Sequence, residues 1–392
     1  MARVAPSLDL VPGSRIRELA DIAMALDGEV LKLYFGESNL PTPRLVKDAA
    51  IDALEAGYTY YTENAGLPSL RRELAYAYRR LHGVELDPAS ELVVTASGVQ
   101  ALNLAIRCTL DPGDEAIVLA PVWPNGAAIV RMANATPVMV AQPLVGDQYR
   151  IDLDAVEAAI TDRTRMILVT SPSNPLGWVA SVEEQQRLLD LCRERDLWLL
   201  ADEVYERLWW AGPEVGAAAP SVLRLASRDD PVVVVQSFSK TYCMTGWRVG
   251  WLVGRRDLVA KATQLNEFVV SHAATFTQKA AEAGLVEGEA GVLELLAMLR
   301  ENRDLCLDAL GSMPGVTVPR PDGAFYLFPR VEGLTDSFAF CRDLLLETRV
   351  GLAPGVAFGD AGEGSLRLCY AAERRILEAA LERLADFLAR RR

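Results

Sequence analysis

Histidine is scarce in this sequence, whose 392 residues contain only His82 and His272. A metal centre with three histidine ligands is therefore excluded, and a catalytic triad with a histidine base has almost no candidates. Cysteine is sparse as well: six residues without a C-x-x-C pair predict buried reduced thiols and neither a disulfide framework nor a metal site. A catalytic base has to be sought among other residue types.

Long apolar runs and excess basic charge are also lacking. No uninterrupted apolar stretch reaches the ~18 residues of a membrane helix, and the first residues contain no apolar signal core. The 40 basic residues stand against 53 acidic ones, a formal charge of −13, which is the wrong sign for binding a phosphate backbone. We therefore expect no membrane partner, no nucleic-acid partner and, by default, a cytoplasmic protein.

What the sequence does contain is a long α/β pattern. Between residues 92 and 253, short β-branched runs alternate with helical patterns such as 154–160 and 182–195, which is typical of a largely parallel sheet covered by helices. Most runs lack period-two alternation, as expected of strands buried on both faces. The runs are 92–95, 116–119, 137–140, 166–170, 197–201, 232–236 and 249–253.

The C-terminal part has a different pattern. Residues 291–311 predict one long amphipathic helix, and short strand-like pieces follow at 316–318, 325–328 and 366–370. A charged helix is expected from about Glu373 onward. This order predicts a second, smaller α+β domain.

One lysine stands just after a predicted buried strand. The run 232–236 leads into a turn with Ser237, Ser239 and Lys240, and Arg248 follows. An ammonium group at the end of a core strand has to be neutralised, paired or used covalently, and a lysine with a depressed pKa attacks aldehydes; the alternative is a surface lysine in a loop. Serine hydroxyls and a guanidinium suit a phosphate dianion. Pyridoxal 5′-phosphate carries both the aldehyde and the phosphate.

That cofactor also needs a carboxylate facing its pyridinium nitrogen. Asp202 ends the buried run 197–201, at the edge where ligands of open α/β sheets bind, and it is a better candidate than Glu203 because it follows the apolar run directly. A pyridinium would keep a buried aspartate ionised. The alternative is that Asp202 only caps the next turn.

These motifs together resemble the class I and II aminotransferases, the fold-type I group of pyridoxal-phosphate enzymes, over nearly the whole chain. The resemblance rests on Ser-Phe-Ser-Lys at 237–240 with Arg248 eight residues later, on Asp-Glu-Val-Tyr at 202–205 and on Asn-Pro-x-Gly at 174–177. Leu176 departs from the threonine that is usual in the family. The implied fold is α/β, with a mostly parallel seven-stranded sheet sandwiched by helices and a smaller α+β domain.

The resemblance also implies how the chain is divided and what it binds. Residues 1–40 would form an N-terminal arm and part of the small domain, 41–288 the large cofactor-binding domain, and 289–392 the C-terminal small domain. The residues expected to contact pyridoxal 5′-phosphate are Ser97, Gly98, Val99, Trp123, Asn174, Asp202, Tyr205, Ser237, Ser239, Lys240, Arg248 and, from a neighbouring subunit, Tyr61.

Individual roles follow from the same resemblance. Lys240 would form the internal aldimine and then move a proton between the substrate α-carbon and the cofactor, which accounts for the missing histidine base. Asp202 would pair with the pyridine nitrogen, while Tyr205 and Asn174 would bind the phenolate. The catalytic residues would be Lys240, Asp202 and Tyr205. The turn Ser97-Gly-Val would offer backbone amides to the phosphate at the start of a helix.

Substrate binding is implied at three further positions. Arg367 lies within the predicted strand 366–370 and would grip the substrate α-carboxylate bidentately, with a structural salt bridge as the alternative. Gly36 and Asn174 would contact the same carboxylate. Tyr61 would reach the phosphate of the neighbouring subunit, which implies a two-fold homodimer with both active sites at the interface.

The expected reaction is ping-pong transamination between an α-amino acid and a 2-oxo acid. Some aspartate-using relatives place a lysine where this chain has Val99, so a neutral aliphatic or aromatic donor is favoured, with 2-oxoglutarate as acceptor by family analogy. Arg15 would be the residue to admit a dicarboxylic substrate. Ile16, Phe325 and Tyr326 are expected to form pocket walls.

Two alternatives remain open. A carbon–sulfur β-lyase or a related eliminating enzyme would keep the same cofactor residues. A cofactor-sensing regulator is disfavoured because the motifs begin near Gly36, which leaves no room for a preceding DNA-binding domain, and because the chain is acidic.

Overall fold

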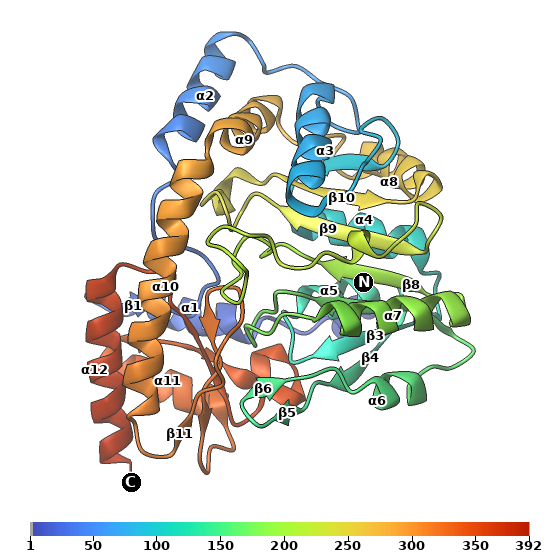
Figure 1. The fold of residues 1–392 in the computed structure, drawn as a ribbon. Coiled ribbons are helices and arrows are strands. Elements are labelled where there is room, and N and C mark those ends of the chain that lie inside the picture. The colour runs from blue at the N-terminus through green and yellow to red at the C-terminus, as the bar shows by residue number, and fades with distance from the viewer. Residues whose placement is uncertain (1–2, 392) are drawn as a thin grey trace.

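The computed structural model describes residues 3–391, and its centre is a seven-stranded sheet (Figure 1). The strand order is β2-β10-β9-β8-β7-β3-β4, and β10 alone runs antiparallel to its neighbours. This confirms the mostly parallel sheet, and every predicted run is a strand. The strands are β2 (Leu92–Thr95), β3 (Glu115–Ala120), β4 (Thr136–Ala141), β7 (Thr164–Thr170), β8 (Trp198–Asp202), β9 (Val232–Ser237) and β10 (Gly250–Gly254).

Six of the seven strands are largely buried on both faces, which is why they lack alternation in the sequence, whereas the edge strand β4 is partly exposed. In β9, Val233 and Val235 belong to one apolar core, whereas Val232 and Val234 belong to the other. Helices α4 (Gly98–Thr109), α5 (Asn125–Met132) and α8 (Arg256–Val269) close the first core. Helices α3 (Pro68–His82), α6 (Leu153–Ala158) and α7 (Val182–Arg195) contribute to the second.

Helix α7 begins and ends where its sequence predicts. Ser181 and Glu184 form a capping box at its start, and Asp196 takes a left-handed conformation at its end. The predicted helix 154–160 corresponds to α6, which starts one residue earlier, at Leu153, and ends two residues earlier, at Ala158.

The C-terminal part is built around a small antiparallel sheet in the order β12-β16-β15. Helix α10 (Glu289–Gly311) starts two residues before the predicted 291. It runs from the end of the molecule near α9 (Thr275–Glu287) down to α12 (Arg374–Arg390) (Figure 1). The small sheet and its helices are β12 (Tyr326–Leu327), β15 (Ala353–Pro354), β16 (Leu366–Cys369), α11 (Ser337–Thr348) and α12 (Arg374–Arg390).

The N-terminal segment packs on this C-terminal part. Helix α1 (Arg15–Met24) contacts α11 and β15, and β1 (Leu31–Lys32) pairs in parallel with β14 (Val350–Gly351). Contacts between the two ends of the chain therefore determine where α1 lies.

The remaining helices and strands are α2 (Arg44–Glu55), α9 (Thr275–Glu287), β5 (Leu144–Val145), β6 (Gln148–Tyr149), β11 (Val316–Thr317) and β13 (Arg330–Val331). The 3₁₀ turns are at Pro6–Leu10, Val222–Arg224, Thr245–Trp247, Gly355–Phe358 and Asp360–Gly362.

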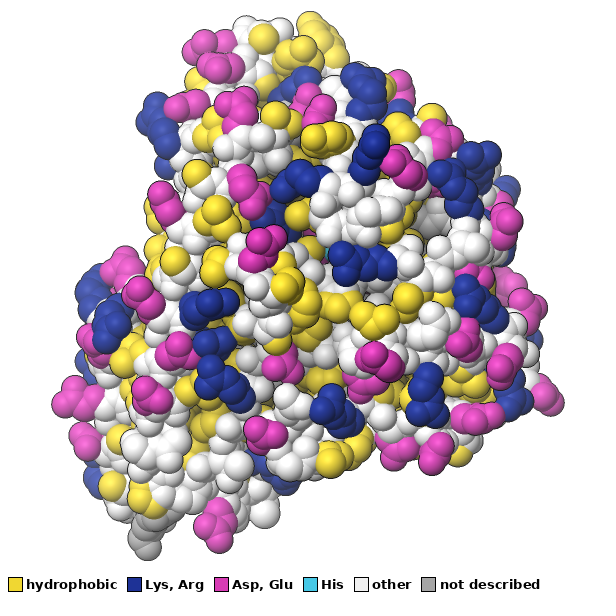
Figure 2. All heavy atoms as spheres, viewed as in Figure 1, with side chains coloured by type: hydrophobic (Ala, Val, Ile, Leu, Met, Phe, Trp, Pro, Cys, Tyr) yellow, Lys and Arg dark blue, Asp and Glu magenta, His cyan; other side chains and the backbone are white. Residues whose placement is uncertain are grey.

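Other sequence expectations can be compared with the structure. All six cysteines are free, and four of them are buried. Acidic and basic side chains are interspersed over the face in Figure 2. Within residues 3–391, no helix combines the length and apolar character needed to cross a membrane.

Candidate active site

A cavity of about 520 Å³ lies where β8 and β9 end, with its lining drawn from both ends of the chain. Its volume falls within the ~300–1,000 Å³ of small-molecule sites. Predicted site residues make up much of the lining, namely Gly36, Gly98, Val99, Trp123, Asn174, Asp202, Tyr205, Ser237, Ser239, Lys240 and Arg248. Sequence motifs separated by about 200 residues therefore meet in one place.

One end of the cavity is suited to an anion. Gly98 opens helix α4, and its free backbone amide lies at the positive end of the helix dipole. The Ser237 and Ser239 hydroxyls lie 2.8 Å apart beside it, and Arg248 faces the same cavity. A Cβ atom at Gly250 would lie 2.5 Å from the Gly98 nitrogen, so glycine at 250 permits the close approach of strand and helix.

Ser97 differs from this expectation. It is the N-cap of α4, and its hydroxyl accepts a hydrogen bond from the Gln100 amide at 3.2 Å. The side chain is buried and does not line the cavity. Its hydroxyl therefore stabilises the helix start, which in turn holds the Gly98 amide in place.

Lys240 is a partly buried amine that lines the cavity. Burial lowers its pKa to about 8, and the nearby guanidinium groups of Arg367 and Arg248 act in the same direction. Its Nζ atom donates a hydrogen bond to the Gly36 carbonyl at 2.5 Å. A substantial fraction of this amine is thus neutral, and nucleophilic, at mildly alkaline pH.

Asp202 is a buried carboxylate with little to compensate its charge. Burial raises its pKa to about 6, against the opposing effects of the Val204 amide, 3.4 Å away, and of Lys240. A cation in contact with this carboxylate would relieve the desolvation cost. Together with the amine of Lys240 and the anion site, it forms a donor set that fits the pyridinium, aldehyde and phosphate of pyridoxal 5′-phosphate.

Arg367 lies behind the cavity wall with its side chain fully buried. Its Nη1 donates to Asn174 Oδ1 at 3.0 Å, its Nη2 donates to the Tyr34 carbonyl, and its Nε has no partner. No acidic side chain among residues 3–391 forms an ion pair with it, so the structural salt bridge considered from the sequence is absent there. A buried, uncompensated guanidinium is costly unless a ligand supplies the anion.

Asn174 links Arg367 to a pair of tyrosines. Its Nδ2 lies 3.4 Å from the Tyr205 hydroxyl, which shares a hydrogen bond of 2.7 Å with the Tyr326 hydroxyl. Tyr326 lines the cavity and also stacks on Arg367, whose Cζ lies 4.6 Å from the ring centroid. Tyr326 was expected only as a pocket wall, but the structure makes it a direct partner of Tyr205.

Some expected residues lie elsewhere. Tyr61 is 90% exposed and packs edge-on against His272, outside the cavity of its own chain. Ile16 is wrong as a pocket wall, because the inner face of α1 buries it in the core; Phe325 is buried next to the site and does not line it. Lining residues that sequence reasoning missed are Arg17, Phe35, Glu37, Leu102, Asn125, Thr170, Val204 and Thr245.

Of these, Thr170 carried a usable signal, since it ends the predicted strand 166–170, one strand over from Asp202 in the sheet. Arg17 carried none. Its position depends on how α1 packs against α11 and β15.

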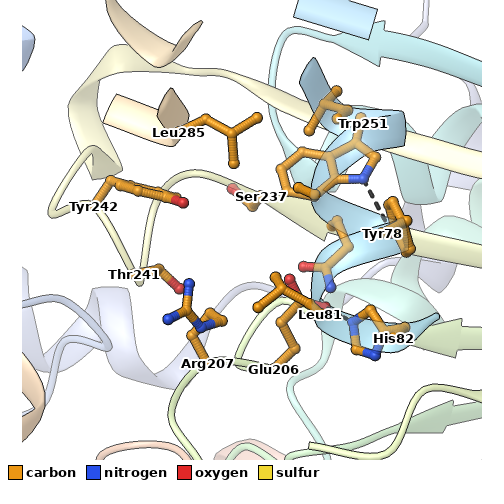
Figure 3. A pocket seen from close by; sticks show the side chains of 13 residues that line it. Tyr78, Leu81, His82, Glu206, Arg207, Ser237, Thr241, Tyr242, Trp251 and Leu285 are labelled. Atoms are coloured by element: carbon orange, nitrogen blue, oxygen red, sulfur yellow. Dashed lines mark hydrogen bonds and ion pairs between the residues drawn. The ribbon is translucent and has the colours of Figure 1, made fainter. Parts of the chain in front are cut away.

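A second, small cavity of about 20 Å³ lies behind the first, between α3 and strands β9 and β10 (Figure 3). Trp251 donates to the Tyr78 hydroxyl at 3.1 Å, and His82 Nε2 lies 2.9 Å from Glu206. His82 Nδ1 and Gln236 Nε2 have no partner among the described residues, and such a space is large enough for about one water molecule.

Glu203 lies close to this polar group and gives a prediction about stability. One carboxylate oxygen accepts from the Val222 amide at 3.0 Å, and burial raises its pKa from 4.5 to about 7. The folded chain therefore holds a proton that the unfolded chain releases, so the free energy of unfolding falls as pH rises from 4.5 to 7. Glu203→Gln should make the protein up to about 3 kcal/mol more stable than wild type at pH 8, but not at pH 4.5.

Urea unfolding at several pH values measures this difference. The same change at an exposed site, Glu194→Gln, serves as the control. The free energy of unfolding of this variant should depend on pH in the same way as that of wild type. Parallel stability curves for wild type and Glu203→Gln would contradict the prediction.

Comparisons with known proteins show which family the chain is similar to. The sequence model for "Aminotransferase class I and II" matches residues 29–384. The chain is 35% identical to "Putative aminotransferase YugH" of Bacillus subtilis, covering 96% of this chain and 95% of that one. It is 32% identical to "Aspartate aminotransferase" of Pyrococcus horikoshii, covering 98% and 97%. The crystal structure of an aromatic aminotransferase from Pyrococcus horikoshii superimposes with a TM-score of 0.88, at 32% identity and 95% and 99% coverage.

Proposed function

Because the chain belongs to the class I and II aminotransferases, a family that is generally dependent on pyridoxal phosphate, we propose that it moves an amino group from a neutral aliphatic or aromatic α-amino acid to a 2-oxo acid such as 2-oxoglutarate. The enzyme is a transaminase, and the identities of its amino donor and its acceptor are what we propose. The observation that carries it is that a partly buried amine, Lys240, lies near a buried guanidinium, Arg367, that has no anionic partner among residues 3–391.

Pyridoxal 5′-phosphate, when bound, supplies an electron sink that stabilises negative charge on the substrate α-carbon. Asp202 would hold the pyridine nitrogen protonated. Ser237, Ser239, Arg248 and the Gly98 amide would bind the phosphate, and Trp123 would cover the ring. Val99 would add a second backbone amide, and Tyr205 with Asn174 would donate to the phenolate oxygen.

Lys240 would act twice. Its Nζ would hold the aldehyde carbon of the cofactor, and the same amine, when free, would take up and give back a proton at the substrate α-carbon. A pKa of about 8 suits both steps, because the neutral and the protonated amine are both populated near neutral pH. No histidine among residues 3–391 lines the cavity, so Lys240 is the candidate base there.

Arg367 would bind the substrate α-carboxylate and orient the α-carbon toward Lys240. The guanidinium is held by Asn174 and the Tyr34 carbonyl, so its direction is determined before substrate arrives. Gly36, whose carbonyl already contacts Lys240, lies at the same end of the cavity. Full burial of Arg367 excludes water from the ion pair and strengthens it.

We extend the proposal to a two-fold homodimer in which Tyr61 serves the neighbouring site. Its support is the exposure of three large aromatic side chains, two in the segment of Tyr61 and one in helix α8, where Glu267 accepts a hydrogen bond from Asn64 at 3.3 Å. Tyr60 is 82% exposed, Tyr61 90% and Phe268 79%. A water-exposed cluster of this kind is expected to be covered by another surface.

The visible spectrum of the protein with pyridoxal phosphate tests the reaction. Addition of a neutral amino acid should convert the cofactor to its pyridoxamine form, and 2-oxoglutarate should restore the original spectrum. Each amino acid is added singly, so the same experiment identifies the donor. Release of pyruvate and ammonia without such interconversion would instead support the β-lyase alternative.

A further inference from the structure

A second arginine, Arg17, faces the candidate active site from helix α1. Residues Ile16, Leu19, Ala20 and Ala23 of this helix are buried, whereas Arg17 is exposed and lines the cavity. Its Cζ atom lies 5.0 Å from the centroid of the Phe35 ring. Phe35 is followed by Gly36, whose carbonyl accepts the hydrogen bond from Lys240. The Arg17 guanidinium therefore stacks one residue away from the residue that contacts the reactive amine.

The guanidinium of Arg17 has no anionic partner among residues 3–391. Its neighbour Arg15 does have one: Arg15 pairs with Glu18 at 2.9 Å, stacks over Phe338 at 4.9 Å and does not line this cavity. The overall charge is −13, so acidic side chains are not in short supply. Stacking on an aromatic face leaves the in-plane N–H groups of an arginine free to bind a carboxylate.

The charges that face the cavity have separate tasks. Asp202, Lys240 and Arg248 belong to the proposed cofactor site. Glu37 also lines the cavity, but its carboxylate accepts from the Thr245 hydroxyl at 3.3 Å, and the Thr245 carbonyl is bound by Arg248 at 2.6 Å. Glu37 is therefore held toward the proposed phosphate end. Arg17 is the remaining cation among the described lining residues, and it has neither an ionic partner nor a role in the proposed cofactor site.

We propose that Arg17 binds the distal carboxylate of a dicarboxylic substrate of the 2-oxoglutarate class, while Arg367 binds its α-carboxylate. This inference rests on the proposed function. It identifies the distal carboxylate as the group by which the site distinguishes a dicarboxylic substrate from a neutral one. It assigns to Arg17 the task for which the sequence offered Arg15, which does not line the cavity.

The two arginines differ in burial in a way that suits these tasks. Every substrate has an α-carboxylate, and Arg367 is fully buried and held by two hydrogen bonds. Only some substrates have a distal carboxylate, and Arg17 is exposed, so water can solvate it when a neutral side chain occupies the cavity. One cavity can thus accept a neutral donor and a dicarboxylic acceptor in turn.

Arg17→Gln tests the proposal, with Arg15→Gln as the matched control on the same helix. The two acceptors compared are 2-oxoglutarate and 2-oxopentanoate, which share a five-carbon chain and differ in the distal carboxylate. Arg17→Gln should lower kcat/KM for 2-oxoglutarate about tenfold, mainly through KM, as expected for a partly solvated charge-assisted hydrogen bond. It should change the value for 2-oxopentanoate less than about twofold. Arg15→Gln should leave both acceptors as in wild type.

A binding measurement separates this inference from the proposed function. Glutarate and pentanoate are unreactive acids that differ in one carboxylate, and calorimetry with the cofactor-loaded protein gives their affinities. Arg17→Gln should weaken glutarate selectively, and raised salt should reduce that difference. Equal losses for both acids, or none, would overturn the role of Arg17 even if transamination is observed. If no amino group is transferred, the proposed function fails, while glutarate binding still decides the role of Arg17.

Discussion

Replacement of Lys240 by alanine is expected to lower kcat/KM for amino transfer by at least about 10⁴-fold. Lys240 is the only lysine that lines the cavity in the described part of the chain, and no histidine lines it. Its loss therefore removes both the amine that attaches to the cofactor and the base at the substrate α-carbon. The other nitrogen-bearing side chains among the described lining residues are guanidinium, amide and indole groups, which are neither nucleophiles nor bases at neutral pH.

Chemical trapping gives a second result that does not depend on turnover. Borohydride reduction of the pyridoxal-phosphate-loaded wild type should fix the cofactor on the peptide that contains Lys240, as mass spectrometry would detect. Lys240→Ala should carry no such adduct and should lack the lysine-dependent visible band.

Lys279 provides the matched control. It is partly buried, pairs with Glu282 at 3.0 Å and does not line the cavity. Lys279→Ala should keep both the adduct and turnover. Sedimentation of each variant at twice the chain mass of 42.8 kDa would show intact folding and would check the proposed homodimer. Full trapping or turnover in Lys240→Ala would refute the cofactor assignment.

Replacement of Asp202 by asparagine should have the second largest effect, a loss of about 10³-fold in kcat/KM together with weaker cofactor binding. The variant keeps the shape of the side chain and removes its charge. A neutral amide would not keep the pyridine nitrogen protonated, so the electron sink would weaken. Cofactor affinity is measured by equilibrium dialysis of pyridoxal phosphate, separately from turnover.

The pH dependence sharpens this prediction. Asp202 has a pKa of about 6 in the cofactor-free chain, so its carboxylate is ionised above pH 6 and neutral below it. The advantage of wild type over Asp202→Asn in cofactor affinity should therefore be large at pH 8 and should shrink as pH falls below 6. A ratio of affinities that does not change with pH would contradict the ion-pair role.

Glu203 is the control for this substitution, because it is also buried and is adjacent in sequence. Its carboxylate binds the Val222 amide and does not line the cavity. Glu203→Gln should keep kcat/KM within a few-fold of wild type. Similar losses at both positions would indicate a general disturbance of the segment after β8.

The local sequence carried enough information to predict the sheet and the residues at its edge. The seven strands are short apolar runs in the sequence, and the parallel ones that are buried on both faces lack alternation, so the strands were visible without knowledge of their neighbours. Lys240 and Asp202 follow such runs closely. Because the carboxyl ends of parallel strands meet at one edge of a sheet, their proximity followed from the order of the elements.

Only the tertiary structure decided which parts of the two chain ends reach the site. The sequence of α1 predicts which face is apolar, but not that this face packs on α11 and β15; hence Ile16 was expected in the cavity and Arg17 was missed. The hydrogen bond between Tyr205 and Tyr326 joins residues 121 positions apart. Such contacts depend on how the segment after β8 packs against β12, and no local pattern in the chain records that arrangement.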